Sequence, residues 1–217
     1  MQSFLERLAS AEPTPGGGGA AAAIAAMGAA LLSMAARHSL SKSPTEPDRL
    51  HLELELRTSE ALRKRCFDLV AADALAFDRF MAACRMPRDA APERERALQL
   101  ALRGTIEVPL ECARAILDGL RLAGTCAAHC HRNVAADAAA GAQALLGALR
   151  ICVLNVRVNA ASLADAAYAG IAGAAADAAL REGAPLAAAA ESLVLERLGT
   201  KGERECSATS KSPRRRH

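Results

Sequence analysis

The chain of 217 residues is 52% hydrophobic and 24% charged, a balance typical of globular proteins and not of disordered ones. Aromatic residues make up 2% and tryptophan is absent, so we expect helices that pack closely through small side chains. The net charge of +3 arises beyond residue 199, where six cations face two acids. The remaining body is near neutrality and lacks the basic surface of a nucleic-acid-binding protein.

Residues 1–199 are expected to form one helical domain, followed by a basic, disordered tail over residues 200–217. The longest uncharged run, residues 20–36, is short for a membrane span and rich in alanine and glycine, so it predicts a buried helix. We therefore expect no membrane partner, and rank a membrane-associated helical protein last. The seven cysteines lie mostly in helix-like segments, which indicates reduced thiols and a cytoplasmic protein.

The first half of the chain predicts three helices. Residues 2–9 form a short amphipathic helix that ends before Pro13 and Pro15. Residues 20–40 form a helix that is apolar on all sides and hence central. After a polar loop over residues 38–48, alternating leucines resemble a strand, but they lack β-branched neighbours, so we predict a helix to residue 83.

The second half also predicts helices throughout. Gly104 is expected to interrupt the first of them. The expected segments are residues 93–102, 108–122, 133–162, 163–181 and 185–198. The product is an all-α helical bundle with long central helices.

Asp73 interrupts an apolar helix face. The apolar residues that share this face by three- and four-residue spacing are Cys66, Leu69, Val70, Phe77 and Phe80. A carboxylate in such surroundings must be paired, hydrogen-bonded or kept for chemistry, because burying it alone is costly. A structural aspartate paired with an arginine and a catalytic aspartate both remain open at this point.

A second polar anomaly lies on the helix predicted after residue 133. Small residues form one stripe with polar groups at both ends: Asp137, Gly141, Ala144, Ala148, Cys152, Asn155 and Asn159. At about 1.5 Å per residue, Asp137 and Asn159 lie roughly 33 Å apart, too far for one small pocket. Two such helices, antiparallel across a two-fold axis, would bring Asp137 of one copy near Asn155 or Asn159 of the other. This favours a homodimer with a composite site.

Four glycines, Gly16 to Gly19, precede the central helix. They are followed by no lysine and preceded by no strand, so neither a P-loop nor a dinucleotide-binding motif fits. Free N–H groups at a helix start suit an anion or a carboxamide oxygen, while missing Cβ atoms suit close packing; both interpretations stay open. Much further along the chain, over residues 125–133, the histidines and cysteines of TCAAHCHRN match no standard zinc spacing, so no metal is expected.

Four stretches follow a single family pattern in order. They are FLERLASAEPTPGGGGAAAAIAAMGAALLSM from residue 4, ADALAF around Asp73, EVPLECAR over residues 107–114 and NVRVNAASL over residues 155–163. Together they resemble the formiminotransferase-cyclodeaminase C-terminal family, which includes bacterial methenyltetrahydrofolate cyclohydrolases. The resemblance covers residue 3 to about residue 198.

The resemblance implies an all-helical homodimer that acts on the one-carbon unit of a tetrahydrofolate derivative, with no tightly bound cofactor. Members either hydrolyse 5,10-methenyltetrahydrofolate to 10-formyltetrahydrofolate or close 5-formimino-tetrahydrofolate with loss of ammonia. A chain without a transferase domain favours the cyclohydrolase. Asp73 matches the aspartate that the family uses for proton transfer, and Asp137 with Lys42 would orient the substrate, so Asp73 and Asp137 are the expected catalytic residues.

Two stretches depart from the family pattern. HSLSK keeps Lys42 but has Ser41 where glycine is usual, and CHRNVAAD keeps Asp137 but lacks the glycine, asparagine and serine expected before it. A non-catalytic folate-binding or interaction protein of the same fold therefore stays an alternative. The expected substrate-binding residues are Pro15, Gly16, Gly17, Gly18, Gly19, Lys42, His131, Asn133, Asn155 and Asn159.

Overall fold

The computed structural model describes residues 2–209, with side chains from residue 2 to residue 199. Its elements are α1 (Gln2–Leu8), α2 (Gly17–Leu40), α3 (Glu46–Cys84), α4 (Ala91–His129), the 3₁₀ helix η1 (Arg132–Val134), α5 (Ala135–Ala160) and α6 (Ala166–Thr209). The described residues contain no strand, which confirms the predicted all-α class.

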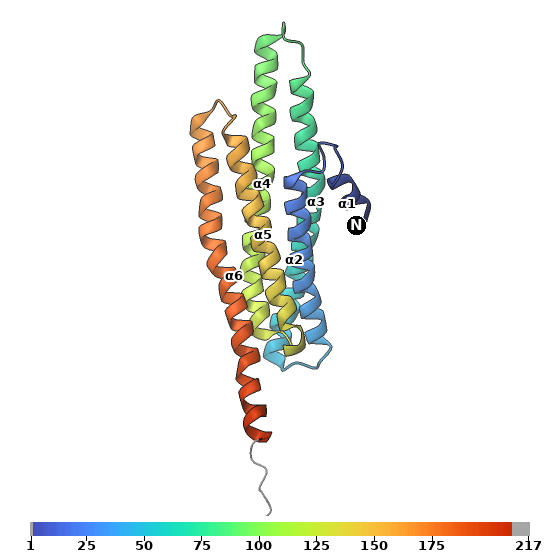
Figure 1. Ribbon diagram of the computed structural model, residues 1–217, viewed down its shortest axis with the longest axis vertical. Helices are drawn as coiled ribbons and strands as arrows, with labels where there is room; N and C mark the ends of the chain where they lie inside the picture. The colour runs from blue at the N-terminus through green and yellow to red at the C-terminus, as the bar shows by residue number, and fades with distance from the viewer. Residues whose placement is uncertain (1, 210–217) are drawn as a thin grey trace, which may run out of the picture.

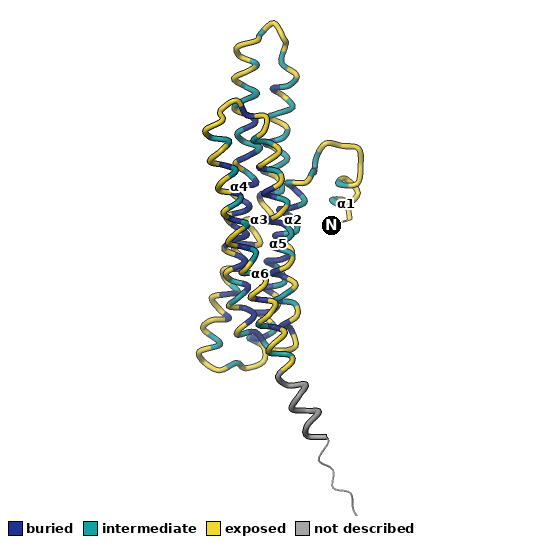
Figure 2. Tube along the Cα trace, turned by 60° about the vertical axis from the view of Figure 1, so that its left-hand side comes forward, coloured by how far each residue is buried: buried dark blue, intermediate teal, exposed yellow. Residues whose placement is uncertain are grey.

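Five long helices, α2 to α6, run side by side as an elongated bundle (Figure 1). Helix α2 packs on α3 and α5, while α4 packs on α3, α5 and α6. The hairpin of α3 and α4 extends beyond the other helices at one end (Figure 1). Helix α1 buries none of its residues and stands off from the bundle on its loop (Figure 2).

Small residues bring the central helices into backbone contact, as the composition predicts. A Cβ added at Gly28 of α2 would lie 2.9 Å from the carbonyl oxygen of Gly141 in α5, and a Cβ at Gly141 would lie 3.0 Å from the carbonyl oxygen of Gly28. Ala148 and Cys152, from the middle of the predicted stripe, are buried in the same chain. The stripe therefore packs mainly within the protomer, and only its flanks remain for a partner.

The predicted helix breaks at Gly104 and ahead of Pro185 are wrong. Helix α4 runs unbroken through Gly104 and Pro109, and α6 runs unbroken through Pro185. Burial of one face along the bundle outweighs a local cost of about 1 kcal/mol for glycine and about 3 kcal/mol for proline. The helix predicted over residues 50–83 is confirmed as part of α3, in spite of its strand-like leucines.

Two helical segments, Gly17–Leu40 and Arg132–Ala160, are long and apolar enough to cross a membrane. Their most apolar windows are 61% and 50% buried inside the bundle, as in core helices. Six cysteines of the described part of the chain carry free thiols, five of them buried. The tail expected over residues 200–217 lies outside the residues whose side chains are described, and its disorder stays a prediction.

Candidate active site

A cavity of about 290 Å³ lies where the start of α2 meets α3, α4 and the end of α5. It is lined by Pro13, Thr14, Gly16, Gly17, Gly18, Asp73, Phe77, Phe80, Leu102, Thr105, Asn155, Val158, Asn159 and Ser162. Residues far apart in the sequence thus converge here, and six of them were predicted from the sequence as site residues.

The carboxylate of Asp73 lies against the first turn of α2. A Cβ at Gly18 would lie 2.6 Å from Cγ of Asp73, so only glycine leaves room for this side chain. The backbone N–H of Gly19 donates a hydrogen bond to the carboxylate. The N-cap residue of α2, Gly16, has no side chain to accept from the free N–H groups, so Asp73 of the neighbouring helix provides the acceptor for one of them.

Asp73 is half-buried, and in the described part of the chain no cation forms an ion pair with it. Burial raises the pKa of its carboxyl above the ordinary value of 3.8, and the Gly19 N–H opposes this only in part. The alternative of an arginine-paired aspartate is therefore excluded for the described residues. A carboxyl with raised pKa in a cavity is suited to proton transfer.

Two asparagines of α5 face the cavity one helical turn apart. Nδ2 of Asn155 donates to the carbonyl oxygen of Ile151 at 2.9 Å, and Nδ2 of Asn159 donates to the carbonyl oxygen of Thr105 at 2.9 Å. A Cβ at Gly17 would lie 3.6 Å from Nδ2 of Asn155. The amide of Asn155 thus lies over the start of α2 and lines the same cavity as Asp73.

One of the glycines makes room for another side chain of the protein. Gly18 admits Asp73 to the start of α2, which favours the close-packing interpretation at that position. At Gly17 a Cβ would lie 3.6 Å from Asn155, an ordinary contact, and both glycines remain in the cavity wall. Pro15 and Gly19, predicted to bind substrate, lie behind the lining, where a Cβ at Gly19 would lie 3.5 Å from Cβ of Pro15. These two residues support the wall and do not form it.

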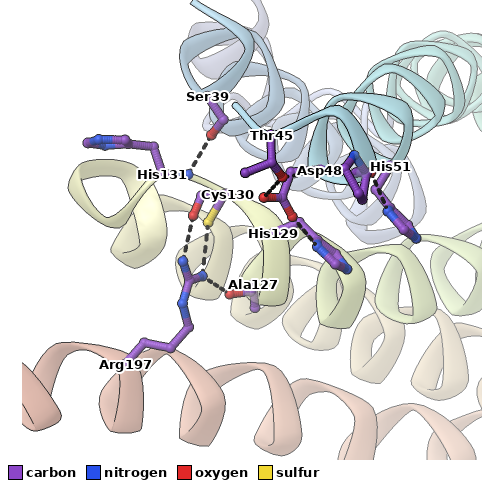
Figure 3. A network of polar contacts seen from close by, with 10 residues as sticks. Ser39, Thr45, Asp48, His51, Ala127, His129, Cys130, His131 and Arg197 are labelled. Atoms are coloured by element: carbon purple, nitrogen blue, oxygen red, sulfur yellow. Dashed lines mark hydrogen bonds and ion pairs between the residues drawn. The ribbon is translucent and has the colours of Figure 1, made fainter. Parts of the chain in front are cut away.

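Lys42 and His131 line a different cavity, of about 430 Å³, at the opposite end of the bundle. The loop that carries His131 is anchored from two helices (Figure 3). Arg197 of α6 donates to the carbonyl oxygens of Ala127 and Cys130, and the backbone N–H of His131 donates to Oγ of Ser39 at 2.7 Å. The guanidinium of Arg197 thus covers the last carbonyls of α4, where the helix dipole favours a cation.

Several titratable groups of this second region have shifted pKa values. The hydroxyl of Thr45 and the ring of His129 lower the pKa of Asp48. A hydrogen bond from Cys126 and the cation of Arg197 lower the pKa of Cys130. No group of three His, Cys, Asp or Glu side chains in the described residues is arranged to hold a metal ion.

Asn133 and Asp137 line neither cavity. Asn133 is exposed, and its backbone N–H donates to Nδ1 of His131 at 3.3 Å. Asp137 is half-buried in the first turn of α5, roughly 33 Å along the helix from Asn159. Within one protomer the structure therefore separates the predicted residues into two groups, as the length of α5 requires.

Several residues of the Asp73 cavity were not predicted from the sequence, among them Thr14, Thr105, Val158 and Ser162. Ser162 follows Asn159 by three residues, a helical spacing that would have extended the polar stripe. Thr105 lies beside the predicted break at Gly104, so its place on a continuous helix was hidden. Thr14 directly precedes Pro15 and the four glycines, but no spacing pattern marked it as a site residue.

Comparison with known proteins agrees with the sequence resemblance. The family model for formiminotransferase-cyclodeaminase matches residues 1–178. A methenyltetrahydrofolate cyclohydrolase of Methylorubrum extorquens is 39% identical over 172 residues, which are 78% of this chain and 83% of that one. A formimidoyltransferase-cyclodeaminase of Sus scrofa is 32% identical over 151 residues, 64% of this chain but 27% of that longer protein.

The fold is also that of a solved relative. The crystal structure of a formiminotetrahydrofolate cyclodeaminase from Thermotoga maritima matches with a TM-score of 0.83, over 91% of this chain and 96% of that one, at 23% identity. A match over most of the chain to one family model, with a relative at 39% identity, leaves a single assignment. The chain belongs to the formiminotransferase-cyclodeaminase family.

Proposed function

We propose that this protein hydrolyses 5,10-methenyltetrahydrofolate to 10-formyltetrahydrofolate. The observation that carries the proposal is the half-buried Asp73 carboxyl, which lies in a cavity, has a raised pKa and has no cationic partner among the described residues. The cyclohydrolase relative, which matches over most of both chains, supports this choice of reaction.

The reaction needs one proton acceptor and one proton donor at the bridge carbon, and Asp73 serves as both in turn. Its carboxylate accepts a proton from water as the water oxygen bonds to the carbon between N5 and N10. The carboxyl then returns this proton to N5 as the C–N5 bond breaks, and the hydroxyl proton of the tetrahedral intermediate leaves to solvent. The products are the 10-formyl group and one net proton.

The cavity walls suit the remaining needs of this reaction. Phe77 and Phe80 offer aromatic faces against which a pterin ring stacks. The side chains of Asn155 and Asn159 offer polar atoms that hold the ring in one orientation. At about 290 Å³ the cavity accommodates the reacting part of a folate and leaves its tail outside.

We further propose that the complete site forms between two copies of the chain. The outer face of α2 and α5 exposes large apolar side chains, among them Met27, Met34, Leu154 and Val158. An antiparallel pairing through this face would bring Lys42, His131 and Asp137 of one copy toward the Asp73 cavity of the other. Exposed apolar residues gathered on two adjacent helices support such an interface.

A cyclodeaminase is the second candidate, because the family includes proteins of that name. Its reaction also passes through a tetrahedral carbon between two nitrogens, and the same carboxyl would protonate the departing ammonia. The two activities differ in substrate, so one assay with both folates separates them.

The test measures loss of 5,10-methenyltetrahydrofolate absorbance above the uncatalysed rate, with 5-formimino-tetrahydrofolate assayed in parallel. We expect acceleration with the first substrate and a fall of about 10²- to 10⁴-fold in the variant Asp73→Asn. The matched control is Asp78→Asn, an exposed aspartate of the same helix. Folded wild-type protein that accelerates neither reaction would refute the enzymatic proposal, and binding without turnover would favour the non-catalytic alternative.

A further inference from the structure

Helix α4 carries a proline in its interior, one turn beyond a residue of the cavity wall. Pro109 is buried and has no backbone N–H, so the carbonyl oxygen of Thr105 cannot receive the hydrogen bond that residue i+4 normally donates. A carbonyl in such a partly buried place needs another donor, because leaving it unpaired is costly.

The missing donor comes from the neighbouring helix. Nδ2 of Asn159 in α5 donates to the carbonyl oxygen of Thr105 at 2.9 Å. A carbonyl oxygen only accepts hydrogen bonds, so the atom of Asn159 that faces it must be the amide nitrogen. This contact therefore fixes the orientation of the Asn159 side-chain amide. The proline in α4 thereby determines the orientation of a side chain in α5.

The second asparagine of the cavity is fixed in the same way. Nδ2 of Asn155 donates to the carbonyl oxygen of Ile151 at 2.9 Å. In the described part of the chain no donor reaches Oδ1 of either asparagine, so both amides keep an oxygen acceptor for a bound molecule. Together with the carboxylate of Asp73, these two amide oxygens give the wall three side chains that can accept hydrogen bonds, which suits the N–H groups of an aminopyrimidine edge.

We propose that Pro109 is a positioning residue, which holds Asn159 so that its Oδ1 accepts a hydrogen bond from the substrate. This inference rests on the proposed function for the identity of the substrate, but the coupling of Pro109 to Asn159 does not. In Pro109→Ala the new N–H competes with Nδ2 of Asn159 for the carbonyl oxygen of Thr105, so that oxygen holds the Asn159 amide less firmly in one orientation.

The kinetic test compares Pro109→Ala with the control Pro185→Ala. Pro185 is the interior proline of α6, and it lines neither cavity. We expect Pro109→Ala to unfold at or above the wild-type temperature while its KM for 5,10-methenyltetrahydrofolate rises about tenfold at nearly constant kcat. Pro185→Ala should keep the wild-type KM. A wild-type KM in folded Pro109→Ala would overturn the positioning role, because a merely structural proline predicts that result.

A thermal-unfolding cycle tests the coupling without any assay of activity. Asn159→Ala should lower Tm by roughly 3–8 °C in the wild-type background, where it leaves the Thr105 carbonyl unpaired, and by much less in the Pro109→Ala background. Equal losses in both backgrounds would refute the shared carbonyl. If wild-type protein shows no folate activity, the function fails while this cycle still decides the coupling.

Discussion

Substituting Gly18 by alanine tests the Asp73 site directly. The added methyl group favours the helix locally but would collide with the Asp73 side chain. In most helix interiors, glycine to alanine stabilises by about 1 kcal/mol. At residue 18 the new Cβ would lie 2.6 Å from Cγ of Asp73 and 2.9 Å from its Oδ2, distances that force the carboxyl away. Overpacking of this kind costs about 1–3 kcal/mol, so we expect no net gain in stability.

Displacing the carboxyl also removes it from the reacting carbon. A shift of about 1 Å in a catalytic group costs on the order of 10²-fold in rate, so Gly18→Ala should lose about that factor in kcat/KM for 5,10-methenyltetrahydrofolate. The matched control is Gly124→Ala in α4, where a Cβ meets no atom within 4 Å. It should raise Tm by about 2–4 °C with unchanged kinetics.

Comparing the two variants tests whether Asp73 must lie against the start of α2. Thermal unfolding and steady-state rates are measured for both at one pH. A Gly18→Ala protein that gains as much Tm as Gly124→Ala and keeps the wild-type rate would refute the reasoning. That result would mean that Asp73 does not need its place against the start of α2.

Four further expectations follow from the same structure. The rate should fall with decreasing pH as Asp73 takes up its proton, with a midpoint above 3.8, and Asp73→Asn should lack this limb in a kcat/KM profile. Glu55 is 2% exposed, and burial raises its pKa to about 8. As pH rises from 4.5 to 8 the unfolded chain releases this proton before the folded protein does, so wild-type stability should fall by up to roughly 5 kcal/mol. Denaturant unfolding of Glu55→Gln should show no such slope, and equal slopes would contradict this. Leu154→Arg should yield monomers in sedimentation, while Ile171→Arg, at another exposed apolar residue on α6, should not. A dimeric Leu154→Arg protein would exclude the α2 and α5 face as the interface. Mixing inactive Asp73→Asn with inactive Lys42→Ala should restore about a quarter of wild-type activity through hybrid dimers, whereas no recovery would argue against a composite site.

Local sequence patterns correctly predicted that the chain is helical and that the carboxylate of Asp73 lies on an apolar helix face. The three- and four-residue spacing of apolar side chains around Asp73 indicated a helix face, and the face is confirmed: Asp73 lies half-buried where α3 meets α2. This succeeded because amphipathic spacing is a property of one helix and its single buried side.

Helix ends and breaks were less predictable. Gly104 and Pro185 carry a local cost, and the sequence does not say whether neighbouring helices compensate for it. In the bundle they do, since a continuous helix buries more apolar surface against its neighbours than two short ones. The carbonyl of Thr105 shows the same principle: Pro109 removes its donor within α4, and the replacement donor, Asn159, lies in α5.

The sequence by itself determined that this chain is helical, that its helices approach closely through alanine and glycine, and that Asp73 is an acidic residue on an apolar helix face. Only the tertiary structure decided that Gly18 faces this acid, that Asn155 and Asn159 share its cavity, and that Lys42 belongs to the opposite end. The physical reason is that periodicity specifies only which side of a helix is buried. Which residues that side contacts depends on the axial position of each helix relative to its neighbours, and this is set by packing over the whole bundle.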